Sequence, residues 1–229
     1  MKTLAIDQSG PLASLSLLED NQELGKRSWA PERLSHHLLY DHIRDLFNEK
    51  AFGVEDLDLV AVGTGPGGFT SLRIAAAAIG GLTLPGGPAL QGVSSGEALA
   101  YGLMKSKGVK SVTVVGDARR NRFWVGRISM QGDDVEVIRD WAVVDADKTP
   151  MELAQADYVA SPDWSRISDF LTEHTPAEKL MTEPAHIDAT ELGLLAQVRV
   201  AAGKINTDVS PIYLHPPVFV EPKFPVPED

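Results

Sequence analysis

The 229-residue sequence contains no cysteine. This excludes disulfides, thiolate metal ligands and a cysteine nucleophile, and it fits a reducing compartment. Long apolar runs are also missing, because none reaches the roughly eighteen residues of a membrane span. Near the N-terminus, Asp7 and Gly10 interrupt the apolar stretch before it attains signal-peptide length. We therefore expect a soluble, cytoplasmic protein with no membrane partner.

Positive charge is scarce as well. Lysine and arginine together number 21 against 32 aspartate and glutamate residues, which gives a formal net charge of −11. Nucleic-acid-binding proteins usually present a basic face that displaces counterions from the phosphate backbone. A chain this acidic repels RNA on average. If it acts on a nucleic acid, we expect another subunit to supply most of the affinity.

The sequence does contain the periodicity of an α/β protein, and 43% of its residues are hydrophobic. Alternating or continuous apolar runs predict strands, and apolar residues at three- and four-residue spacing predict helices. Thr70 is placed to cap one helix, and Ser94 or Ser95 another that ends near Lys105. The other elements predicted in the first half are strands at 2–7, 12–19, 23–30, 57–62 and 89–93 and helices at 33–50 and 71–84.

The second half repeats the opening plan. A three-stranded meander is followed by a further strand, a stretch of mixed character to about residue 185, and a helix. Residues 216–229 hold five prolines, which exclude a core helix or a central strand and predict an extended tail. The elements predicted here are strands at 109–118, 122–129, 135–144 and 156–161 and a helix at 190–204.

A three-stranded antiparallel meander that leads into βα units, in two halves, is the layout of the actin-like ATPase (ribonuclease H-like) fold of sugar kinases and Hsp70. We therefore predict an α/β fold with two similar βββαβαβα-type subdomains. The predicted division is an N-terminal subdomain at 1–106, a C-terminal subdomain at 107–214 and a proline-rich tail at 215–229.

A glycine-rich turn between a predicted strand and helix has several interpretations. Gly63, Gly65 and Gly68 satisfy G-x-G-x-x-G, but the following strand ends without the acidic residue that a dinucleotide site needs. No lysine follows the glycines, so the turn is not a G-x-x-x-x-G-K-[ST] loop. Tight packing and a ligand or partner surface remain open. If the turn holds a phosphate or nucleotide, the candidate residues are Asp7, Gly63, Gly65, Gly67 and Gly68.

Several motifs, in order along the chain, resemble one family. GTGPGGFTSLRIAAAAIGGL, followed by GVSSGEALA, is similar to the signature of TsaB (YeaZ-type) proteins. LAIDQS resembles the first strand of that family, and the D-A-R and terminal P-x-Y-L motifs are matched by Asp117-Ala118-Arg119-Arg120 and Pro211-Ile212-Tyr213-Leu214. The resemblance spans about residues 2–214. It implies a glycoprotease-like member of the actin, Hsp70 and sugar-kinase superfamily.

For function, the resemblance implies a non-catalytic partner subunit of the machinery that makes threonylcarbamoyladenosine (t6A) in tRNA. Such a subunit binds and activates the TsaD transferase, with an associated ATPase subunit, and it reaches tRNA only through the complex. The resemblance implies no catalytic residue and no tightly bound cofactor, with ATP or ADP placed at a subunit interface. Isolated chains are expected to self-associate. The implied partner surface lies on the first two helices, at His36, His37, Tyr40, Thr70, Arg73, Ala76, Ala77 and Gly80.

The sequence departs from the family pattern at Gln8, Gly68 and Ser71, which stand where the family has Thr, Ser and Gly. The H-x-x-x-H metal pair of the catalytic relatives is also absent, because Tyr40 and Asp41 follow the two adjacent histidines at that spacing. His37 and Asp41 could act as a pair of ligands, but two ligands are too few for a transition-metal site, so we expect no bound metal. A G-x-S-x-G hydrolase motif is absent too.

Arg119, Arg120 and Arg122 concentrate positive charge at a predicted hairpin turn. They form either a solvated turn, in which Asp117 pairs with an arginine, or a contact for RNA or an acidic partner. Two rival functions also stay open. One is a stand-alone nucleotide-dependent transferase or kinase of the superfamily, and the other is a degenerate homodimeric interaction protein.

Overall fold

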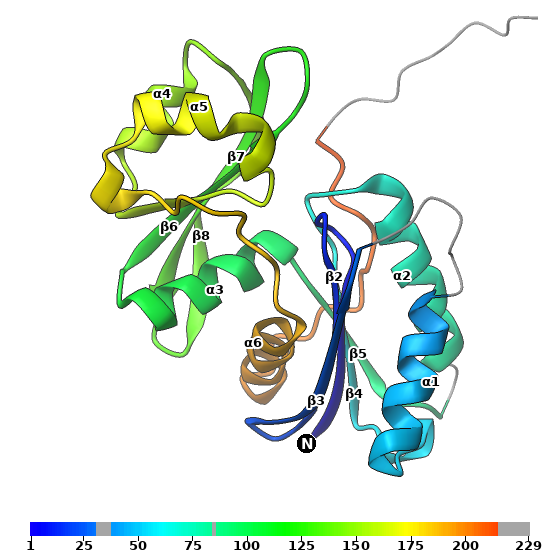
Figure 1. Ribbon diagram of the computed structural model, residues 1–229. Helices are drawn as coiled ribbons and strands as arrows, with labels where there is room; N and C mark the ends of the chain where they lie inside the picture. Colours follow the sequence, from blue (N-terminus) through cyan, green and yellow to red (C-terminus); the bar gives the residue numbers. More distant parts are fainter. Residues whose placement is uncertain (31–37, 84–85, 215–229) are drawn as a thin grey trace, which may run out of the picture.

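The computed structural model describes residues 1–30, 38–83 and 86–214. His36, His37 and the predicted tail at 215–229 lie outside them. The described chain forms two β-sheets with helices around and between them (Figure 1). This is the predicted actin-like α/β fold, and its first half has the predicted βββαβαβα order.

The first sheet has the strand order β3-β2-β1-β4-β5. The first three strands are antiparallel, and β1, β4 and β5 run parallel. This confirms the predicted meander and the two parallel βα units that follow it. The strands are β1 (Lys2–Asp7), β2 (Ala13–Glu19), β3 (Gln22–Trp29), β4 (Leu59–Gly63) and β5 (Ala89–Val93).

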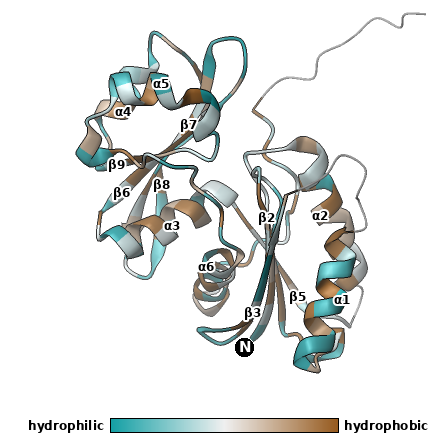
Figure 2. Ribbon diagram, in the orientation of Figure 1, coloured by the Kyte–Doolittle hydropathy of each residue, from teal (hydrophilic) through white to brown (hydrophobic). Residues whose placement is uncertain are grey.

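Helices cover both faces of this sheet, which explains why the middle of β1, at Leu4 to Ile6, and β4 form continuous apolar runs. On one face, Leu4 and Ile6 share a core with α1 (Leu38–Lys50) and α2 (Phe69–Leu82). On the other face, α3 (Ser95–Lys107) and α6 (Ala189–Ala201) pack between the two sheets. Figure 2 shows apolar strands in the sheet and hydrophilic segments on α1.

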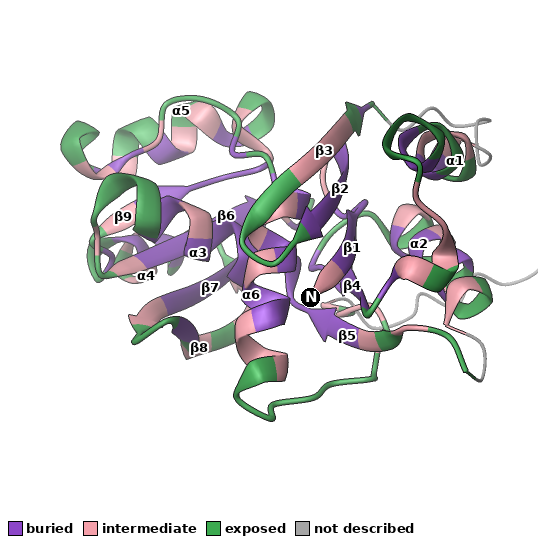
Figure 3. Cartoon of the chain, turned by 90° about the horizontal axis from the view of Figure 1, so that it is seen from below, coloured by how far each residue is buried: buried purple, intermediate pink, exposed green. Residues whose placement is uncertain are grey.

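The second sheet has the order β8-β7-β6-β9, with β9 parallel to β6. Most of β6 and β7 is buried, and exposed residues gather on the outer helices of this half (Figure 3). The elements of this half are β6 (Ser111–Asp117), β7 (Arg122–Gln131), β8 (Asp134–Asp145), α4 (Thr149–Ala154), β9 (Tyr158–Ala160) and α5 (Trp164–His174).

The second half is shorter than the predicted repeat. It forms βββαβα, and the helix predicted to complete it, α6, packs on β1 and β2 of the first sheet instead. Leu192, Leu195 and Ala196 are fully buried there. Gly193 lets α6 come close, because a Cβ at this position would overlap Leu18 and lie 3.0 Å from the Ala5 Cβ. The division at 106/107 stays a proposal, with α6 as a segment that returns to the first sheet.

Two local predictions differ from the structure and one agrees with it. Thr70 does not cap α2, because the helix begins at Phe69 and its N-cap is Gly68, without a side-chain bond. The stretch of mixed character before residue 185 contains α5. Ser94 does cap α3, since its hydroxyl accepts a hydrogen bond from the Glu97 N–H.

An ion-pair network joins the two halves through α6. Arg199 contacts Glu97 of α3 and Asp134 of β8, both at 3.0 Å, and Lys204 contacts Asp134 at 2.7 Å. Burial opposes ionisation of Asp134, but hydrogen bonds from Lys204, the Val135 N–H and Arg199 outweigh it and lower the pKa of this carboxyl. Asp134 therefore contributes stability above the ordinary aspartate pKa, and this is lost as pH falls through its lowered pKa.

We predict that Arg199→Met destabilises the protein by about 3–5 kcal/mol at neutral pH, because it leaves the largely buried Glu97 carboxylate unpaired and Asp134 with Lys204 as its remaining cation. The unfolding midpoint should fall by roughly 6–20 °C, measured by calorimetry. Lys204→Met is the matched control, since Lys204 is 62% exposed and its loss should cost far less. Equal effects of the two changes, or a deficit that does not shrink in acid, would contradict this assignment.

Candidate functional site

The glycine-rich turn lies beside the end of β1. Strands β1 and β4 are parallel neighbours with Ile6 opposite Val62, so Asp7 and Gly63 end at the same edge of the sheet. A Cβ on Gly63 would overlap the Asp7 carboxyl and lie 2.6 Å from the Ser95 hydroxyl oxygen. Gly65 has a φ of +96°, a conformation that favours glycine. Close packing therefore requires glycine at both positions.

Asp7 is fully buried and is bonded from within the protein. One carboxyl oxygen accepts hydrogen bonds from the Ser9 hydroxyl at 2.7 Å and the Ser9 N–H at 2.9 Å. The other accepts from the Ser95 hydroxyl. Burial raises the pKa of Asp7, although these hydrogen bonds act in the opposite direction. The carboxyl thus ties β1 to the N-terminus of α3 and is not exposed to a ligand.

Three amides of the turn donate to the protein itself. Thr64 N–H donates to the Val93 carbonyl at 2.9 Å, Gly65 N–H to the Ser95 hydroxyl at 2.9 Å, and Gly68 N–H to the Ser9 carbonyl at 2.8 Å. In a phosphate loop such amides point at the ligand. A Cβ on Gly67 would overlap the Ser9 backbone. These contacts favour the packing interpretation of the turn over the phosphate-loop interpretation.

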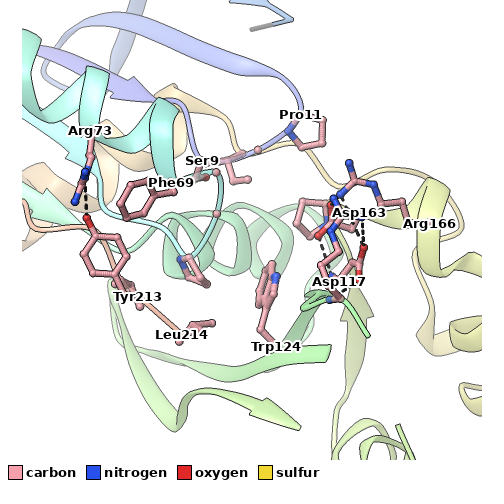
Figure 4. A pocket seen from close by; sticks show the side chains of 18 residues that line it. Ser9, Pro11, Phe69, Arg73, Asp117, Trp124, Asp163, Arg166, Tyr213 and Leu214 are labelled. Atoms are coloured by element: carbon pink, nitrogen blue, oxygen red, sulfur yellow. Dashed lines mark hydrogen bonds and ion pairs between the residues drawn. The ribbon is translucent and has the colours of Figure 1, made fainter. Parts of the chain in front are cut away.

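A cavity of about 880 Å³ opens between the two halves of the chain (Figure 4). We call it the cleft. It is bordered by the β1–β2 turn, the glycine-rich turn, the β6–β7 turn, the start of α5 and the segment before residue 215. Trp124, largely buried, stands in its wall and packs edge-on against Trp141 with ring centroids 5.8 Å apart.

One end of the cleft is aromatic. The rings of Phe69 and Tyr213 have centroids 5.1 Å apart, and they are 48% and 51% exposed. The Arg73 guanidinium lies 3.9 Å from the Phe69 ring centroid, and its Nε donates to the Tyr213 hydroxyl at 3.2 Å. Among the described residues no carboxylate pairs with Arg73. This end therefore presents aromatic rings beside a cation that has no carboxylate partner in the described part of the chain.

The other end of the cleft is charged but internally paired. Asp117 contacts Arg119 at 3.1 Å and Arg166 at 3.9 Å, and Arg166 also lies 3.5 Å from Asp163. The Asp117 N–H donates to the Asp163 carboxyl at 3.0 Å. Burial raises the pKa of Asp163, partly offset by that hydrogen bond and by the arginines.

The arginine-rich turn thus forms the pairing that one interpretation predicted, because Asp117 pairs with Arg119. Arg119, Arg120 and Asn121 all have positive φ, between 54° and 66°, so the turn is tight. Arg120 is exposed, and Arg122 is half-buried at the start of β7. A contact of these arginines with RNA or an acidic partner stays a proposal.

The face formed by α1 and α2 carries most of the predicted partner-binding residues. Tyr40, Thr70, Arg73, Ala77 and Gly80 are exposed, whereas Ala76 is half-buried. Ala75 and Ala78 form the inner side of α2. A Cβ on Gly80 or Gly81 would meet nothing within 4 Å, so this side of the helix is open.

Other chemistry finds little support in the part of the chain that the structure describes. No group of three or more histidine, aspartate or glutamate side chains there is placed to hold a metal ion. Nor is any described helix long and apolar enough to cross a membrane. His42 packs its ring on Trp29, with centroids 4.3 Å apart.

Sequence reasoning missed the cleft. Phe69 and Tyr213 enter the sequence analysis only as parts of motifs. Asp163 lies just before α5 and Arg166 lies in its first turn, and the sequence analysis did not predict this helix. The sequence signal for the cleft was the P-x-Y-L motif, which contains the exposed Tyr213. In the structure this motif lies beside the glycine-rich turn, because the Ile212 N–H donates to the Thr64 carbonyl at 2.8 Å.

Two glycine substitutions test the packing interpretation. We predict that Gly63→Ala costs about 1–3 kcal/mol or more, because its Cβ would displace Asp7 and Ser95. Gly80→Ala is the matched control and should stabilise α2 by about 0.5–1 kcal/mol, since the added Cβ meets open space in a helix. Chemical denaturation of both variants measures the difference. A Gly63→Ala protein as stable as the wild type would show that close packing does not require this glycine.

Comparison with known proteins places these features in a family. A family model described as TsaD, tRNA N6-adenosine threonylcarbamoyltransferase, matches residues 30–209. A curated relative, tRNA threonylcarbamoyladenosine biosynthesis protein TsaB of Escherichia coli K12, is 28% identical over 125 residues, 54% of each protein. The match thus spans about half the length of that relative.

Two solved structures from Pseudomonas aeruginosa match over nearly their whole length. One, described as an uncharacterized protein with similarity to peptidase YEAZ, is 26% identical with a TM-score of 0.79, covering 93% of this chain and 99% of its own. The other, YeaZ, is 25% identical with a TM-score of 0.77 and the same coverage. The chain is thus similar to TsaB and YeaZ. Since the family model matches well over half of its residues, the chain belongs to the TsaD-like family.

Proposed function

We propose that this chain is a non-catalytic partner subunit in t6A biosynthesis, which binds and activates a TsaD-type transferase through α1 and α2. The observation that carries the proposal is the open outer side of α2, at Ala77, Gly80 and Gly81. Similarity to TsaB over half of that protein's length supports the pathway.

The chemistry of this face suits close helix packing. Arg73 is the single charged residue of α2, and beyond it the exposed residues of the helix are Ala77, Gly80 and Gly81, which are all small. Although the chain has a net charge of −11, α2 contains no carboxylate. A partner that packs on α2 therefore does not have to desolvate a carboxylate of this helix. Small side chains also let a second helix approach to short interaxial distance. Tyr40, 53% exposed on α1, adds an aromatic anchor of the kind enriched at interfaces.

A supporting role, and not catalysis, agrees with the interior of the glycine-rich turn. Asp7 and the amides of Gly65 and Gly68 bond within the protein, which disfavours the rival of a stand-alone kinase or transferase. ATP or ADP at a subunit interface remains part of the proposal, as does the associated ATPase subunit. We place the complex in the cytoplasm. The net charge of −11 supports contact with tRNA only through the complex.

A substitution on the outer side of α2 tests the partner surface. We expect Ala77→Glu to weaken association with a TsaD-type partner at least tenfold, because it adds bulk and a carboxylate where a helix should pack. Isothermal titration calorimetry measures the affinity. Self-association of the isolated chain, measured by light scattering, should weaken in parallel.

Ser165→Glu, an exposed position on α5, is the matched control and should bind like the wild type. Both variants should unfold within a few degrees of the wild type, since neither position is buried. A chain that ignores the transferase, or an Ala77→Glu variant that binds it unchanged, would refute this surface.

A further inference from the structure

We propose that the cleft is a docking site for the segment of this chain that follows Leu214, with Pro216, Val218, Phe219 and Glu221 as its contact residues. The inference does not depend on the proposed function. It rests on three observations: the chemistry of the cleft, the place where the described chain ends, and the composition of the next residues.

The cleft offers a ready surface for an apolar, extended peptide. Phe69 and Tyr213 expose half of their surface side by side, and the wall continues through Pro11, Pro66 and Trp124 (Figure 4). Exposed, contiguous aromatic surface of this kind usually marks an interaction site. Grooves lined by aromatic rings are also the common receptors of proline-rich segments, which bind in the polyproline II conformation.

The path of the backbone brings the following residues to this groove. The Ile212 N–H donates to the Thr64 carbonyl at 2.8 Å, and the Tyr213 ring packs on Phe69. Leu214 itself lines the cavity, so the next residue begins at its edge. A polyproline II segment advances about 3.1 Å per residue, and a short tether keeps its effective concentration in the millimolar range. Even weak contacts would then suffice for occupancy.

The residues that follow have matching chemistry. Residues 215–224 read HPPVFVEPKF, with three prolines that lower the entropy lost on binding. Phe219 and the two valines beside it supply apolar surface for the aromatic end. Among the described residues, Arg73 contacts the Phe69 ring and the Tyr213 hydroxyl but no carboxylate. Glu221 would supply the missing negative charge.

The absence of cysteine allows a clean test in the full chain. We would introduce Pro11→Cys in the cleft together with Val220→Cys and follow disulfide formation in oxidised glutathione. A second pair, Gly68→Cys with Val220→Cys, guards against a misfolded first variant, since a Cβ at Gly68 meets nothing closer than 3.7 Å. Thermal unfolding checks that each variant is folded.

Both pairs should form an intramolecular disulfide. Adding Val218→Ser and Phe219→Ser to the same pairs should slow it at least tenfold, because the tether is unchanged and only the docking contacts are lost. Equal rates with and without the apolar residues would overturn the proposal, since they would indicate a tether that does not dock. Disulfides that join two copies would also overturn it, in favour of exchange between chains.

Discussion

The structure depends on the buried carboxyl of Asp7, where the end of β1, the glycine-rich turn and the start of α3 meet. Three hydrogen bonds from Ser9 and Ser95 hold it, and Gly63 leaves the space that it fills. The same serine, Ser95, also accepts the Gly65 N–H, so the carboxyl and the turn are organised by one hydroxyl. The glycine-rich turn determines where α2 begins. It therefore also positions the aromatic end of the cleft and the outer face of α2.

The strands and most helices could be predicted from the sequence because the spacing of apolar residues within each segment indicates which of its residues are buried. Continuous apolar runs in the middle of β1 and in β4 follow from helices on both faces. The cap of α3 could be narrowed to Ser94 or Ser95 because a cap bonds within its own first turn, and the structure shows that it is Ser94. Long-range packing could not be predicted. The apolar residues of α6 show that the helix is buried, but its fit against Ala5 and Leu18 depends on Gly193 meeting residues far away in the sequence. Helix α5 was missed although its amphipathic pattern buries Ile167 and Leu171.

The candidate sites divide in the same way. The outer side of α2 was accessible to sequence reasoning because Ala77 and Gly80 lie on one helix, and both are exposed. The cleft was not, because its aromatic end joins Arg73 to a tyrosine 140 positions further along the chain. Asp7 was a candidate ligand-binding residue, but its serine partners, one of them at a separation of 88 residues, favour a structural role.

We propose that this chain acts through a helix face and not through a nucleotide loop of its own. The most direct measurement is t6A formation by a TsaD-type transferase and its ATPase subunit, with and without the chain, in wild-type and Asp7→Asn forms. The account predicts that t6A forms only when the chain is present, and that a folded Asp7→Asn variant supports it at a rate within a few-fold of the wild type. ATP turnover by the isolated chain that Asp7→Asn abolishes would contradict it.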